Sequence, residues 1–155
     1  MKRIVGGSEM KALDGCTITG MGVPSCVLME RAAECVARKA EQLCDQKTLQ
    51  ILAICGVGNN GADGVAAARM LYLHGFDVLV VVVGNEAHAT KEFEVQKGIA
   101  EKLEIPVVDW EHFLHGEDEQ KAGDCAIIDA VFGVGLSRDV EGTYAAVLDL
   151  SLIHI

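Results

Sequence analysis

The sequence predicts an α/β protein with a mainly parallel, doubly wound sheet in three layers, preceded by two helices. Short, almost wholly apolar runs alternate along the chain with segments of helical periodicity. Glycine-rich stretches directly follow two of the apolar runs, as they do where a buried strand turns into a helix. The 155 residues are half apolar, which is enough for a single domain over 1–155 with its own hydrophobic core.

Two helices are expected before the sheet begins. Ser8 is a suitable N-cap for a helix from Glu9 to about Cys16. Pro24 suits the first turn of a second helix, in which apolar residues recur at helical spacing from Val27 to Leu43. The first part of the chain is therefore expected to form a helical cover.

Buried strands and connecting helices should alternate after this cover. Runs as apolar as these are typical of parallel strands that are covered on both faces. The segment 109–123 is polar and acidic and is expected to be a loop with a short helix. The expected strands are 49–55, 78–83, 105–108 and 125–128, and the expected helices are 64–74, which stops at Gly75, and 89–103, which Pro106 soon ends.

Composition and charge exclude several classes of protein. The formal net charge is −10 and the basic residues are scattered, so nucleic acid is not an expected partner. The longest apolar run, 78–83, is far too short to span a membrane, and no apolar segment follows the basic N-terminus as in a signal peptide. A cytoplasmic protein is expected. Its six cysteines have no metal-like spacing and are expected to be buried, reduced thiols, with Cys55 and Cys125 in strands.

The first glycine-rich loop has the form of a dinucleotide-binding turn. Residues 56–61 match Gly-x-Gly-x-x-Gly, follow a strand and open a helix, as in Rossmann-like proteins. Two features differ from an ordinary dehydrogenase. Asp63 lies at the start of the helix, where its carboxylate would compete with a pyrophosphate for backbone N–H groups. In addition, the acidic residue that a dehydrogenase has at the end of its second strand is not clear, since Asp77 precedes that strand and Glu86 lies beyond it.

Polar side chains in both loops are candidates for binding and catalysis. For Asp63, a functional role and a simple role as the N-cap of a helix from Gly64 are equally well supported. For Asn59 and Asn60 a functional role is favoured over turn formation, and for Asp129, at the end of a strand, over capping. Both loops should lie at one sheet edge, where oxygens of Asn60 and Asp129 would suit a weakly bound cation.

The segment from Cys55 to Leu71, with Gly-Asn-Asn-Gly-Ala-Asp-Gly at its centre, resembles the YjeF N-terminal domain, the family of NAD(P)H-hydrate epimerases. Three further segments agree with this family in order and at plausible spacing, so that the resemblance spans nearly the whole chain. They are 9–14, 22–32 and 129–136.

The resemblance implies an isomerase of nicotinamide nucleotide repair, which interconverts the R and S forms of hydrated NADH and NADPH. It also implies a homodimer, and a separate ATP- or ADP-dependent dehydratase that consumes the S form. Asn60 and Asp129 would hold a potassium ion, and Asp63 and Asp129 are the candidate catalytic carboxylates. The substrate contacts carried over are Asn59, Asn60, Gly61, Ala62 and Asp63 in the first loop, and Gly133, Val134, Gly135, Leu136, Ser137, Arg138 and Asp139 in the second.

Two departures from the family pattern qualify this prediction. Ala62 replaces the usual second glycine after the paired asparagines and adds one methyl group. The family's Asp-x-Pro-Ser-Gly segment, which supplies another substrate contact and a cation contact, is not found before the chain stops. A domain that is incomplete at its C-terminus is therefore expected, and the identity of the general acid or base stays open.

Other interpretations compete with the epimerase hypothesis. A non-catalytic ligand-binding or dimerisation module of the same family is the main alternative, and a conventional NAD-dependent dehydrogenase is the weakest. His112 and His115 could share a helix face, but a solvated role is favoured over metal binding because no third ligand is evident. Arg138, in the second loop, could meet a phosphate, whereas Arg69 is expected to have a surface or packing role.

Overall fold

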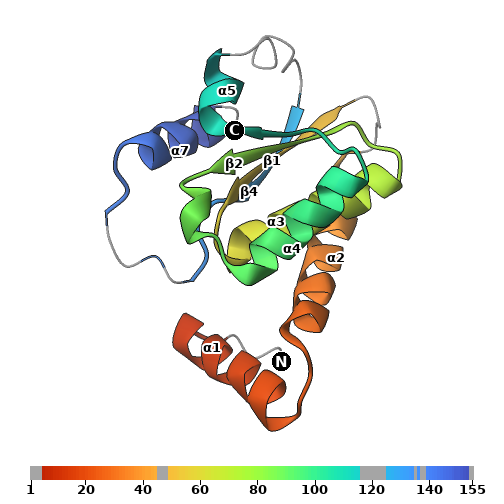
Figure 1. The fold of residues 1–155 in the computed structure, drawn as a ribbon, viewed down its shortest axis with the longest axis vertical. Helices are drawn as coiled ribbons and strands as arrows, with labels where there is room; N and C mark the ends of the chain where they lie inside the picture. Colours follow the sequence, from red (N-terminus) through yellow and green to blue (C-terminus); the bar gives the residue numbers. More distant parts are fainter. Residues whose placement is uncertain (1–4, 45–48, 116–124, 135, 137–138, 154–155) are drawn as a thin grey trace.

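A four-stranded sheet forms the centre of the structure (Figure 1), a computed structural model that describes residues 5–44, 49–115, 125–134, 136 and 139–153. Its strand order is β3-β2-β1-β4, and every neighbouring pair is parallel. The strands are β1 (Gln50–Gly56), β2 (Val78–Val83), β3 (Val107–Asp109) and β4 (Cys125–Ala130). The predicted doubly wound parallel sheet is confirmed.

Helices cover both faces of this sheet, which gives the predicted three layers (Figure 1). On one face lie α2 (Ser25–Leu43), α3 (Asn59–Leu73) and α4 (Lys91–Lys102), and on the other α5 (Trp110–His115) and α7 (Thr143–Ile153). Helix α1 (Gly7–Gly15), continued by the π-helix η1 (Cys16–Gly20), stands beside the carboxyl ends of the strands, and the 3-10 turn η2 (Glu86–His88) precedes α4.

Two expected details were wrong, and one helix was missed. Gly6, not Ser8, is the N-cap of α1, and its N–H donates to the Glu9 carboxylate at 3.1 Å. Helix α3 begins at Asn59 after the N-cap Gly58, five residues earlier than Gly64, because the first helical turn packs closely against β1. Helix α7 was not predicted from the sequence.

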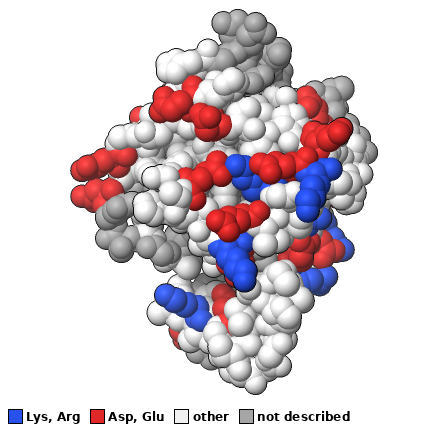
Figure 2. Space-filling model, in the orientation of Figure 1, with Lys and Arg blue, Asp and Glu red and all other residues white. Residues whose placement is uncertain are grey.

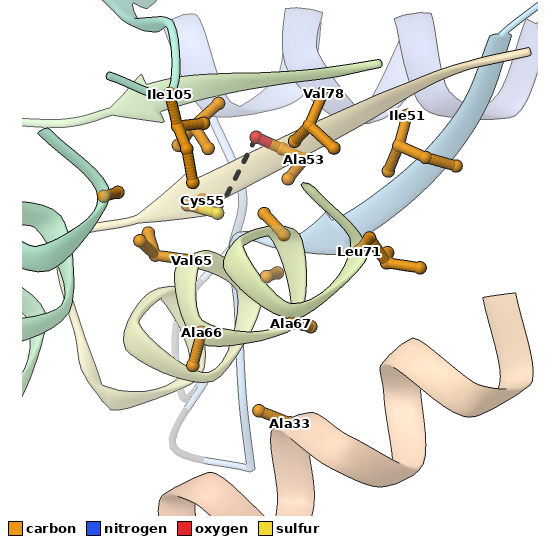
Figure 3. Close-up of a cluster of buried hydrophobic side chains, with 14 of the residues drawn as sticks. Ala33, Ile51, Ala53, Cys55, Val65, Ala66, Ala67, Leu71, Val78 and Ile105 are labelled. Atoms are coloured by element: carbon orange, nitrogen blue, oxygen red, sulfur yellow. Dashed lines mark hydrogen bonds between the residues drawn. The ribbon is translucent and has the colours of Figure 1, made fainter. Parts of the chain in front are cut away.

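Small side chains build the larger of the two cores. Figure 3 shows Ala66 and Ala67 of α3 between the sheet and Ala33 of α2, so that three layers of backbone approach closely. All six residues of β2 are buried, as expected for a strand covered on both faces. Burial raises the pKa of the Cys55 thiol, and the charge of Asp129 raises it further, so this cysteine stays neutral. All six cysteines are free, but the expectation that they are buried holds only for Cys44 and Cys55, since Cys125 is partly exposed and the three in α2 and η1 are exposed.

A partly buried polar cluster joins the three helices of this layer. One guanidinium nitrogen of Arg69 donates to both Glu30 carboxylate oxygens, at 2.6 and 2.7 Å, and Gln96 donates to Oε1 at 3.1 Å. Gln96 is only 3% exposed, whereas Glu30 is partly exposed. Arg69 thus has the packing role expected of it and fixes α2 against α3, and Gln96 joins α4 to α2 through the same carboxylate. Among the described helices, none has the length and hydrophobicity that a membrane span requires.

The close approach of α3 to the sheet gives the first prediction. A Cβ on Gly64 would lie 2.4 Å from the Ala130 Cβ and 2.8 Å from the Cys55 sulfur, so Gly64→Ala should lower the free energy of unfolding by about 1–3 kcal/mol. Gly98, inside α4, has open space around it, and Gly98→Ala should raise stability by about 0.4–1 kcal/mol. Urea unfolding of both variants checks this, and a similar change in the two would contradict the close contact.

Candidate functional site

The site lies where the chain reverses direction across the sheet. From β1 the chain proceeds to β2 on one side, and β4 returns to the other side of β1. In open α/β sheets, ligands bind at this point, beyond the carboxyl ends of the strands. The turn between β1 and α3 and the segment after β4 meet there, as the sequence predicted.

Glycine at two positions lets these segments come together. A Cβ on Gly61 would lie 1.6 Å from the Gly56 carbonyl oxygen, and a Cβ on Gly56 would lie 2.4 Å from the Val131 carbonyl oxygen. No larger residue fits either place. The first turn of α3 therefore sits directly on the end of β1, with its N-terminal N–H groups at the sheet edge.

Asn60 joins the two predicted ligand loops. Its amide nitrogen donates to the Phe132 carbonyl oxygen at 3.0 Å, and a Cβ on Gly133 would lie 3.2 Å from the Asn60 Cβ. Because the nitrogen makes this bond, the amide oxygen is fixed beside Gly133, where it can accept a hydrogen bond or coordinate a cation. The fixed Oδ1 is what makes Asn60 a suitable ligand.

Asp129 lies at the end of the neighbouring strand. It pairs with Ile54 in the sheet, is exposed, and accepts a hydrogen bond from the Val131 N–H at 3.1 Å. Alternation along β4 places it on the face of Ile127, whereas Asn60 starts a helix on the opposite face. Asn60 and Asp129 thus share the sheet edge but approach it from different sides, and their joint binding of a cation stays a prediction.

Asp63 has an unusual environment in the second turn of α3. Since the helix begins at Asn59, Asp63 cannot be its N-cap, and that interpretation is wrong. Burial, and secondly the charge of Asp14, raise the Asp63 pKa from 3.8 to about 6. A carboxyl group with this pKa can both donate and accept a proton near neutral pH.

Helix α1, which was predicted as part of a helical cover, forms a third wall of the site, a position that the sequence did not predict. At its C-terminal end Asp14 acts electrostatically on Asp63, and at its N-terminal end a Cβ on Gly7 would lie 3.4 Å from the Val134 Cβ. The helix therefore spans from the first loop to the second. Asp14 is the functional candidate that sequence reasoning missed, because an acidic residue on a short polar helix carries no distinguishing signal.

The remaining predicted substrate contacts differ in accessibility. Asn59 is exposed, whereas Ala62 is buried in the core and its N–H donates to the Gly58 carbonyl at 3.0 Å. The extra methyl group of Ala62 therefore packs inward and does not narrow the loop. Val134 is 81% exposed and Leu136 46%, so the second loop offers apolar contacts to a ligand. Asp139 is also exposed, and Gly135, Ser137 and Arg138 lie outside the described residues.

Metal-ligand residues of the usual kind are not clustered in the described part of the chain. No group of three or more His, Cys, Asp or Glu side chains there could hold an ion. This agrees with the solvated role favoured for His112 and His115, both exposed on α5. Any cation at the sheet edge would have to rely on amide, carbonyl and single carboxylate oxygens.

Comparison with known families decides the assignment. The family model described as YjeF-related protein N-terminus matches residues 25–152. The chain belongs to this family. The predicted resemblance, drawn from the loops now seen to meet, is confirmed.

Curated relatives in this family have a common name. The chain is 40% identical over 147 residues to the NAD(P)H-hydrate epimerase of Limosilactobacillus fermentum, covering 95% of this chain and 67% of that protein. It is 38% identical over 145 residues to the NAD(P)H-hydrate epimerase of Oenococcus oeni, covering 94% and 66%. The chain thus spans about two thirds of the length of these relatives.

A solved structure confirms the fold independently. The crystal structure of the yeast protein ynu0 superimposes with a TM-score of 0.84 and covers 96% of this chain and 64% of that one. At 21% identity the likeness concerns the fold alone.

The raised pKa of Asp63 gives a prediction with a definite sign. The folded protein holds this proton more tightly than the unfolded chain, so the free energy of unfolding should fall as pH rises from about 4 to about 6. Asp63→Asn removes the loss and should raise the Tm at pH 7.5 by about 2–4 °C, about 1 kcal/mol after allowance for solvent screening, with little effect at pH 4.

Two variants control this measurement. Asp149→Asn, on an exposed part of α7, should leave the pH dependence of the Tm unchanged. Asp14→Asn should lower the Asp63 pKa, which carboxyl NMR titration can follow directly. An equal Tm gain for Asp63→Asn at both pH values would contradict the assigned environment.

Proposed function

We propose that this chain is an isomerase that interconverts the R and S forms of hydrated NADH and NADPH. The observation that carries the proposal is the bond from Asn60 to Phe132, which joins the two glycine loops into one site. It occurs in a chain up to 40% identical to proteins named NAD(P)H-hydrate epimerase. The substrate class comes from those relatives, and the residues that would act on it come from the geometry.

The start of α3 would hold the pyrophosphate of the substrate. Its N-terminal N–H groups lie at the sheet edge, and a helix N-terminus stabilises an anion without any net positive charge. This matters because the protein carries a net charge of −10, and acidic and basic side chains are interspersed on the face in Figure 2. The backbone N–H groups at the start of α3 can therefore stabilise a pyrophosphate even though the overall charge of the protein is negative.

Asp63 would provide the proton transfer. Inversion at the hydrated ring carbon can proceed by opening and reclosing of the ring, or by departure of the protonated hydroxyl group as water and return of water to the opposite face of the cation that remains. In either route no ring C–H bond breaks, and a group must donate a proton and later recover it. A carboxyl group with a pKa of about 6 is balanced for both roles near neutral pH. Asp14 would act as a positioning residue, because it helps to hold the proton on Asp63. Asp129, the second candidate, would assist from the other strand end.

We propose that a potassium ion binds at this edge of the sheet. The fixed Oδ1 of Asn60, the exposed carboxylate of Asp129 and neighbouring carbonyl groups are hard oxygen donors with low total charge. Such an ion would neutralise part of the substrate's negative charge. We propose Asn60 and Asp129 as its side-chain ligands.

The product of the reaction implies a second enzyme. Epimerisation alone leaves the nucleotide hydrated, so a stereospecific dehydratase that uses ATP or ADP must remove the water from the S form. We propose such a dehydratase as the functional partner, and homodimeric assembly and a cytoplasmic location as further expectations from the family.

The activity can be tested with the R form of NADH hydrate, potassium and an S-specific dehydratase. The chain should speed consumption of the R form, and Asn60→Ala should slow it at least a hundredfold, since the amide fixes both loops. Gln42→Ala, on the exposed side of α2, should behave as the wild type. Consumption at the spontaneous rate with the wild type would sink the proposal, and tight binding without turnover would indicate a ligand-binding module.

The ion can be tested separately by thermal shift. Potassium should raise the Tm more than lithium at equal ionic strength, because binding to the folded state stabilises it. Asp129→Asn should reduce this difference, whereas Asp149→Asn should not. Equal shifts with both ions would exclude a selective potassium site.

A further inference from the structure

A cavity that the proposed reaction does not use lies at the same edge of the sheet. It has a volume of about 440 Å³, is open to solvent on one side, and is bordered by the ends of β2 and β3 and the starts of α5 and α7. Its walls include the aromatic residues Trp110 and Tyr144 and the polar residues Asn85, Asp109 and Glu111. Helix α7 forms one side, so the cavity could not be foreseen from the sequence motifs.

The cavity shares a wall with the proposed catalytic site. Phe132, whose carbonyl oxygen accepts the Asn60 bond, has its ring 5.1 Å from the ring of Tyr144. The Tyr144 hydroxyl lies 2.6 Å from where a Cβ on Gly84 would be, and Val57 of the first loop lies 3.7 Å from the same point. Gly84, Val57 and Tyr144 therefore form the boundary between the Asn60 site and the cavity, and a ligand that occupied both would pass over this boundary.

The distance between the end of β1 and the cavity suits the two halves of a dinucleotide. Neighbouring strands are about 4.8 Å apart, so the gap between β2 and β3 is about 7 Å from the end of β1. A pyrophosphate linkage between two ribose groups spans this distance. With the hydrated ring near Asp63 and the pyrophosphate at the start of α3, the second nucleoside would enter the cavity.

The cavity has the groups that a nucleoside needs, with a bias against extra phosphate. Asp109 pairs with Val82 in the sheet and so stands beside the end of β2, where an acidic residue accepts the ribose hydroxyl in dinucleotide-binding folds. One Asp109 oxygen caps α5 by accepting the His112 N–H at 2.8 Å, which leaves the other for a ligand. Glu111 adds a second carboxylate, and the described residues that line the cavity include no Lys or Arg.

We propose that this cavity binds the second nucleoside of the substrate and that Asp109 and Glu111 make NADH hydrate the preferred substrate, with NADPH hydrate accepted more weakly. The carboxylates would accept hydrogen bonds from the ribose hydroxyls and would repel a 2′-phosphate. This selectivity rests on the proposed function, but it concerns the half of the substrate that does not react.

Trp110 permits a direct test, because it is the chain's sole tryptophan and lines the cavity. Titration with ADP-ribose should change its fluorescence, and the 2′-phosphorylated form of ADP-ribose should bind about tenfold more weakly. The difference should shrink as salt is raised, since the repulsion is electrostatic. Equal affinity for both probes would overturn the proposal. So would an unchanged Trp110 fluorescence at a concentration of ADP-ribose that saturates the protein as judged by calorimetry.

Matched variants separate the cavity from the overall charge. Asp109→Asn combined with Glu111→Gln keeps the cap on α5 and should bring the two affinities within about twofold. Glu94→Gln combined with Glu101→Gln removes the same charge from exposed positions on α4 and should keep the tenfold preference. An unchanged preference in the first pair, or its loss in the second, would refute the assignment of these carboxylates.

The same proteins distinguish failure of this inference from failure of the proposed function. If both hydrates are epimerised with equal kcat/KM, the function stands and the nucleotide selectivity is refuted. If ADP-ribose binds with the expected preference but neither hydrate is epimerised, the cavity is supported as a nucleoside site and the proposed catalysis is refuted.

Discussion

The near-contact of backbone between the end of β1, the first turns of α3 and the end of β4 determines the site. Gly56, Gly61 and Gly64 each occupy a place where a Cβ would collide with the neighbouring element. Without side chains there, α3 can start at the sheet edge, and Asn60 can reach the Phe132 carbonyl at 3.0 Å. The close packing of the backbone therefore determines the positions of the two glycine loops, the position of α3 and the orientation of the Asn60 amide at the same time.

This packing raises the pKa of the Asp63 carboxyl group to about 6. Asp63 lies one turn into α3, where the surrounding core removes water and Asp14 adds a negative charge. The stability lost on ionising such a group is small compared with the total of a domain of this size. In the same layer, the partly buried cluster of Arg69, Glu30 and Gln96 holds three helices together.

The strands were the most predictable part of the fold, because Val78–Val83 is apolar throughout and all of it is buried. The start of α3 was not, since Asn and Gly are poor helix formers and only contact with β1 makes them helical. In the site, sequence motifs located Asn60 and Asp63. They could not reveal Asp14 or Asp109, whose roles depend on a helix or strand brought close from elsewhere in the chain.

The exposed position of α1 links the docking of this helix to the proton on Asp63. None of the residues of α1 is buried, so the helix is held by few contacts, among them that of Gly7 with Val134. Since its presence favours the protonated form of Asp63, thermodynamic reciprocity requires that protonation of Asp63 strengthen the docking of α1. Displacement of α1 would remove the charge of Asp14 from the neighbourhood of Asp63, so the proton on Asp63 reports whether this helix is docked.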